Sequence, residues 1–196
     1  MGIGWARRVW SLVVVIVVTA AVGCVTQQIP EGAKEYVVFH GLIQPTALAF
    51  SPDGRVFVAE KRGVVKVFDD LDDDSPDVVV DLRTQVNNLW DRGLLDIALP
   101  PDFPTDPSIY VLYTYDALPG GTAPRWGRPN TDNDNCPTPP GVTTDGCVVQ
   151  GRLSRLTLDG NSAVGQEQVL LEAWCQQFPS HSIGSLAFAP DGALYV

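Results

Sequence analysis

The sequence predicts an all-β fold, a β-propeller, from a repeated phrase, the spacing of its copies and a turn-rich composition. The phrase reads LAFSPDGRVFV at residues 48–58 and LAFAPDGALYV at 186–196, with a looser copy, IALPPDFPTDPSIYV, at 97–111. Apart from an insertion at 117–150, the period is roughly 50 residues, which is typical of four-stranded propeller blades. The 18 glycines and 16 prolines favour turns and short strands. A β-sandwich is the alternative, but it does not repeat one phrase at this spacing.

Short apolar runs bounded by Gly, Pro and Asp define the expected strands. The acidic run at 69–74 lacks the spaced ligands of an EF-hand loop, so we expect it to be a solvated hairpin tip. The chain should hold about two blades and the start of a third, which predicts an N-terminal fragment of a longer protein. The expected strands are 36–39, 47–50, 56–59, 64–68 and 78–80 in the first unit, and 94–99, 109–115, 151–157 and 168–172 in the second.

The N-terminus has the pattern of an export signal. Two arginines precede an almost wholly apolar stretch, and small residues then lead to Cys24. We expect residues 1–24 to be a signal peptide of the lipoprotein type, with Cys24 lipidated, and residues 25–35 to be a tether. Cleavage without lipidation and an uncleaved anchor are the alternatives. Each places the remaining chain, 36–196, outside the cytoplasm, either secreted or lipid-anchored at the outer face of the cell membrane.

Charge and cysteine usage restrict the partners and the chemistry. The net charge of −10 argues against nucleic acid, and it leaves the signal or lipid anchor as the expected link to a membrane. An extracytoplasmic location permits disulfides, and Cys136 and Cys147 flank one loop and form the favoured pair. Pairing of Cys147 with Cys175 is the alternative. The cysteines lack C-x-x-C spacing, so we expect no metal site in them.

Polar residues stand six to eight positions before the end of the first strand of each unit. They are Gln44, then Asp91 with Arg92, then His181, and they predict a polar cluster at the mouth of the central channel. His181 lies among small residues and is a candidate general base near neutral pH. A loop histidine bonded to a backbone carbonyl is the alternative. Trp90, Trp126 and Trp174 could stack on sugar rings. Packing in the core or between blades is the more common role of tryptophan.

Residues 42–115 and 174–196 resemble the secreted glucose/sorbosone dehydrogenases. The resemblance rests on residues 44–60, on GLLDIALPPDF at 93–103, and on SHSIGSLAFAPDG at 180–192. It implies a six-bladed propeller that uses pyrroloquinoline quinone (PQQ) with calcium. The full-length protein would oxidise an aldose or similar sugar and pass electrons to an external acceptor.

The resemblance also assigns roles to single residues. His181 matches the catalytic histidine, which takes the proton of the anomeric hydroxyl while hydride passes to the quinone. Asp91 stands where the family carries Gln or Glu near the cofactor, and Asp96 replaces a family glycine. Basic residues and calcium ligands belong to later blades, so we expect this chain alone to be inactive. The alternative function is a non-catalytic extracytoplasmic propeller that binds glycans or peptides.

Overall fold

The computed structural model describes residues 30–132, 134–136 and 147–196. The expected signal peptide and Cys24 therefore lie outside the described residues. The chain divides into two units, Met1–Tyr36 and Val37–Val196, and the second holds all the strands of the described residues. No helix within the described ranges is long and apolar enough to span a membrane.

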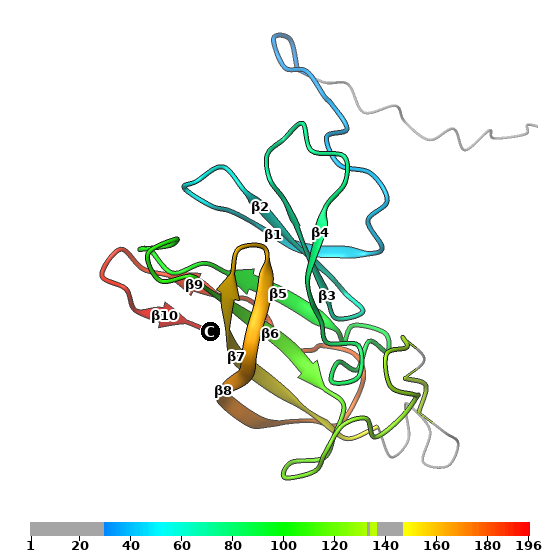
Figure 1. Cartoon of the computed structure of the whole chain (residues 1–196). Coiled ribbons are helices and arrows are strands. Elements are labelled where there is room, and N and C mark those ends of the chain that lie inside the picture. The colour runs from blue at the N-terminus through cyan, green and yellow to red at the C-terminus, as the bar shows by residue number, and fades with distance from the viewer. Residues whose placement is uncertain (1–29, 133, 137–146) are drawn as a thin grey trace, which may run out of the picture. The chain divides into compact units, whose positions relative to one another are not determined.

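The second unit contains two four-stranded antiparallel sheets and a two-stranded hairpin (Figure 1). Each sheet is a simple meander, in which every strand pairs with the next along the chain. This arrangement confirms an all-β fold with two blades and the start of a third. The strands are β1 (Pro45–Phe50), β2 (Val56–Glu60), β3 (Val64–Phe68) and β4 (Asp77–Asp81); β5 (Leu94–Ala98), β6 (Ser108–Tyr115), β7 (Val149–Asp159) and β8 (Ser162–Gln176); and β9 (Ala187–Phe188) and β10 (Leu194–Tyr195).

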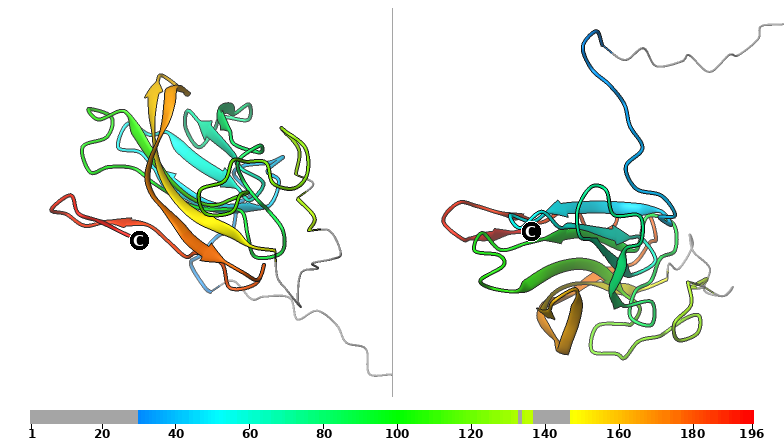
Figure 2. Two further views of the ribbon diagram at one scale, coloured as in Figure 1. Left: turned by 90° about the horizontal axis from the view of Figure 1, so that it is seen from below. Right: turned by 45° about the horizontal axis from the view of Figure 1, so that its top comes forward.

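The two sheets stack as layers through a shared core (Figure 2). Phe57 and Val65 of the first sheet meet Ile109 and Val111 of the second, and all four side chains are fully buried. A second core joins the β5–β8 sheet to the hairpin and includes Leu186. Strands buried on both faces need apolar residues at successive positions, which explains the near-continuous apolar runs in the sequence.

One expected strand is absent. Residues 36–39 pair with no strand among the described residues, and Tyr36 is 73% exposed. Phe39 instead stacks on Phe68, with the ring centroids 3.8 Å apart, so only the end of this segment contacts the first sheet, on the face that carries Val56 and Val58. The strand propensity of the run YVVF is overridden because aromatic burial against that face offers a better contact.

The last two strands of the second sheet are longer than the sequence predicted, and the insertion has ordered contacts of its own. β7 and β8 form a long, bulged ribbon where only short strands were expected. The acidic run at 69–74 forms the exposed connection between β3 and β4, as expected. At the start of the insertion, Asp116 is fully buried and its carboxylate accepts hydrogen bonds from the backbone of Arg125 and Trp126. Cys136 and Cys147 are joined in a disulfide that closes the following loop, and Cys175 is exposed and free.

Candidate functional site

The loops that enter the three inner strands share an unusual backbone conformation. Gln44 precedes β1, Trp90 precedes β5 and His181 precedes β9, with φ values of 49°, 55° and 58° respectively. Residues other than glycine seldom adopt this left-handed conformation, and such residues gather at functional sites. Trp90 is 53% exposed, so it is a rim residue rather than a core residue. The sequence did not predict Trp90 as a site residue, because its exposure depends on a backbone conformation that the residue type does not reveal.

Asp91 and His181 lie in direct contact. The Asp91 carboxylate accepts a hydrogen bond from the His181 backbone N–H at 3.0 Å, and the Asp91 N–H donates to the carbonyl of Pro179 at 3.1 Å. The sequence placed these two residues at one channel mouth although 90 positions separate them. Their pairing fixes the loop that carries the candidate base against the loop before β5.

His181 is open to solvent. His181 is exposed and, with Ser180, lines a hollow of about 290 Å³. Below it, the Ser182 hydroxyl lies 3.0 Å from that of Thr114 and donates to the Gln176 side chain at 3.1 Å. The backbone around His181 is therefore anchored while its ring remains free for a ligand, which is the arrangement that a general base requires. The other residues lining the hollow are Cys175, Gln176, Gln177 and Phe178.

Arg92 does not belong to the polar cluster predicted at the channel mouth. Its side chain is fully buried and donates to the carbonyl oxygens of Cys147 and Gln176. Burial lowers the pKa of Arg92 to about 10. It ties the disulfide-closed loop to the end of β8, which is a structural role.

The backbone carbonyl of Gln44, in turn, accepts from the Lys61 N–H at 2.9 Å and joins β1 to the following hairpin.

The buried carboxylate of Asp134 and the half-buried Lys61 are linked through Asn88, close to Asp91. The Lys61 ammonium donates to the Asn88 carbonyl, and the Asn88 N–H donates to the carboxylate of Asp134 at 3.0 Å. Burial raises the pKa of Asp134 to about 7 and lowers that of Lys61, whose charge is supported by Asp91 and Asp134. Sequence reasoning missed Asp134 because it lies in the insertion, outside the repeat.

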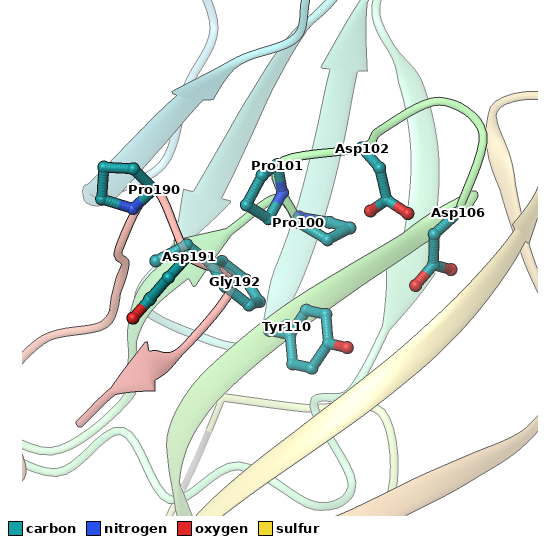
Figure 3. A pocket seen from close by; sticks show the side chains of 9 residues that line it. Pro100, Pro101, Asp102, Asp106, Tyr110, Pro190, Asp191 and Gly192 are labelled. Carbon is teal, nitrogen blue, oxygen red and sulfur yellow. The ribbon is translucent and has the colours of Figure 1, made fainter.

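A second hollow lies at the other end of the inner strands (Figure 3). Its volume is about 410 Å³, and it is lined by Asp102 and Asp191 in the turns that follow β5 and β9 and by Tyr110 of β6. Asp106, on its margin, is paired with Arg155 at 2.7 Å. None of the predicted site residues lines it. Among the described residues, no group of three or more His, Cys, Asp or Glu side chains is arranged to hold a metal ion.

Comparison with solved structures identifies the fold. An oxidoreductase described as a glucose dehydrogenase, from Thermus thermophilus, is 29% identical with a TM-score of 0.57 and is matched over 81% of this chain and 38% of its own. The PQQ-bound aldose sugar dehydrogenase of Streptomyces coelicolor is 20% identical, with a TM-score of 0.54, over 81% of this chain and 39% of its own. The chain thus spans less than half of either structure.

Comparison by sequence gives two further matches. The Hedgehog-interacting protein of Mus musculus is 28% identical over 165 residues, which make up 81% of this chain and 21% of the mouse protein. The family model of the glucose/sorbosone dehydrogenases matches residues 42–196, which include both sheets, the hairpin, Asp91 and His181. The chain therefore belongs to the glucose/sorbosone dehydrogenase family.

Proposed function

We propose that the full-length protein containing this chain oxidises an aldose or a similar sugar with PQQ, and that His181 is the general base. The observation that carries the proposal is the environment of His181, an exposed imidazole on a fixed backbone at the edge of a hollow. The family supports a sugar oxidoreductase. The name of the Streptomyces coelicolor relative supports PQQ as the cofactor.

The chemistry assigned to His181 is a proton transfer. An imidazole nitrogen of His181 would accept the proton of the anomeric hydroxyl as the substrate is oxidised. The bound quinone would supply the hydride acceptor. Asp91 and Ser182 contribute by fixing the backbone on both sides of the ring, and a positioned base needs less reorganisation to reach the reacting proton.

The described residues fit one part of a quinone site. His181 and the exposed Trp90 provide a base and an aromatic surface at the rim. The nearby cations are already engaged, because Lys61 donates to Asn88 and Arg92 is buried beneath the loops. The quinone's carboxylates and a calcium ion would therefore take their partners from outside these residues. For this reason we propose that the chain on its own is inactive.

A second candidate is a non-catalytic propeller that binds glycans or peptides. The match to the Hedgehog-interacting protein supports it, since that relative is named for a protein partner. The contact of Asp91 also fits it, because one oxygen of that carboxylate accepts from the His181 backbone, which is a structural role that needs no cofactor. Both candidates fit an extracytoplasmic location, which we propose from the leader sequence and from the Cys136–Cys147 disulfide.

The decisive experiment is reconstitution of the full-length protein with PQQ and calcium. We expect sugar-dependent reduction of an electron-accepting dye, with a rate that saturates as PQQ is added. The same preparation without PQQ is the control. If the folded protein gains no sugar-dependent rate with saturating PQQ and calcium, the enzyme proposal is wrong. Binding of glycans or peptides by that preparation would then favour the second candidate.

A further inference from the structure

Two aspartates on one side of the second blade hold the segment that carries His181. Asp91 lies just before β5 and Asp96 lies within it. The Asp91 carboxylate accepts from the His181 N–H at 3.0 Å. One oxygen of Asp96 accepts from both the Ser185 hydroxyl and the Leu186 N–H, each at 2.6 Å. The stretches 91–96 and 181–186 therefore run side by side in the same direction and are fastened at both ends.

The backbone of β5 aims Asp96 at this segment. The pairing of β5 with β6 is irregular between Leu94 and Asp96, and a bulge of this kind turns a side chain out of the regular alternation. The second oxygen of Asp96 accepts from the Ile97 N–H at 2.8 Å, which fixes the carboxylate. Asp96 is half-buried, and its hydrogen bonds are charge-assisted, so they are stronger than neutral ones.

The first blade has no carboxylate at the corresponding bulge, because Ala47 stands in the place of Asp96. The pairing of β1 with β2 is irregular between Pro45 and Ala47, and there the Thr46 hydroxyl donates to the Leu94 carbonyl at 2.6 Å. The junction between the first two blades thus includes a hydrogen bond from a neutral hydroxyl at this bulge. The junction that leads to His181 uses a carboxylate with two donors on the opposing segment.

We infer that Asp91 and Asp96 form a two-point clamp that fastens residues 181–186 to the second blade and thereby sets the position of His181. Between the two points, the Ser182 hydroxyl bonds to Thr114, so the segment is also held in the middle. Asp96 touches neither the His181 ring nor the hollow beside it. It is a positioning residue, and its effect on catalysis rests on the proposed function, whereas the clamp itself does not.

Amide hydrogen exchange of the full-length protein tests the clamp without any turnover. We expect Asp91→Ala to raise exchange at the His181 amide, and Asp96→Ala to raise it at Leu186, each about tenfold or more. Asp159→Ala is the matched control, because Asp159 is an exposed carboxylate at the end of β7. Exchange within 181–186 that stays at the control level in both variants would overturn the clamp.

Kinetics of the reconstituted protein test the positioning role. Asp96→Ala should lower kcat about tenfold or more while the KM for the sugar changes less than about twofold, because the base is displaced while the wall of the hollow at 175–178 is not. Asp96→Asn keeps an acceptor oxygen and should restore part of kcat. If exchange rises but kcat stays at the Asp159→Ala value, the positioning role is wrong. If the wild-type protein has no activity, the proposed function fails and the exchange result still decides the clamp.

Discussion

Gly93 is the position where a single methyl group should do the most damage to the junction between the blades. Its φ of 151° is one that residues with side chains rarely adopt. A Cβ there would lie 2.5 Å from the Lys61 carbonyl oxygen and 2.6 Å from Lys61 Cγ. That carbonyl cannot retreat freely, because it accepts the hydrogen bond from the Leu94 N–H at 2.8 Å.

The expected cost of Gly93→Ala combines two effects. Backbone strain at such a φ costs about 1–3 kcal/mol, and the overlap with Lys61 adds about 1–3 kcal/mol. We therefore expect the free energy of unfolding to fall by about 2–6 kcal/mol. Gly184→Ala is the control, because Gly184 does not have a positive φ and a Cβ there meets nothing within 4 Å.

Urea unfolding of the full-length protein, followed by tryptophan fluorescence, measures the difference between the two glycine variants. Gly93→Ala should lower the midpoint with little change in the slope of the transition, whereas Gly184→Ala should stay within about 1 kcal/mol of the wild type. Equal midpoints for the two variants would refute the reasoning, since it depends on the conformation of Gly93 and on its distance from Lys61.

Two further predictions concern the insertion. Because burial raises the pKa of Asp134 from 3.8 to about 7, the folded state should lose up to about 4 kcal/mol of stability as the pH rises from about 4 to 7. Asp134→Asn should therefore gain stability over the wild type across this range in melts at a series of pH values, and a constant difference would contradict the assignment. The Cys136–Cys147 disulfide closes a loop with a sequence separation of 11, so reduction or Cys136→Ser should lower the unfolding free energy by about 3 kcal/mol. An unchanged melting temperature under reductant would show that the loop does not contribute.

The repeat made the blades predictable. Each Pro-Asp-Gly phrase joins the first two strands of a unit, and the buried strands are apolar at successive positions because both faces are covered. The 36–39 segment was misread because local propensity carries no information about which edge or face a segment meets. Phe39 finds Phe68, and only the assembled sheet presents that partner.

The site was predictable only in part, for a different reason. The repeat indicated that Asp91 and His181 lie at one end of the inner strands, and they are in contact. It gave the same weight to the neighbouring Arg92, which is buried. Asp91 is exposed and Arg92 is buried, and the repeat alone does not indicate which of two adjacent polar side chains turns inward. Asp134 lies beside the site and comes from the insertion, which has no counterpart in the repeat.

The most direct test of the account is the effect of removing the His181 imidazole. In the reconstituted full-length protein, His181→Ala should lower kcat/KM for the preferred aldose about a hundredfold to ten-thousandfold relative to His40→Ala. His40 is the chain's other histidine and is exposed at the start of the fold. Melting temperatures that match within a few degrees would exclude a folding effect. Equal kcat/KM values in the two variants would contradict the assignment of His181 as the base.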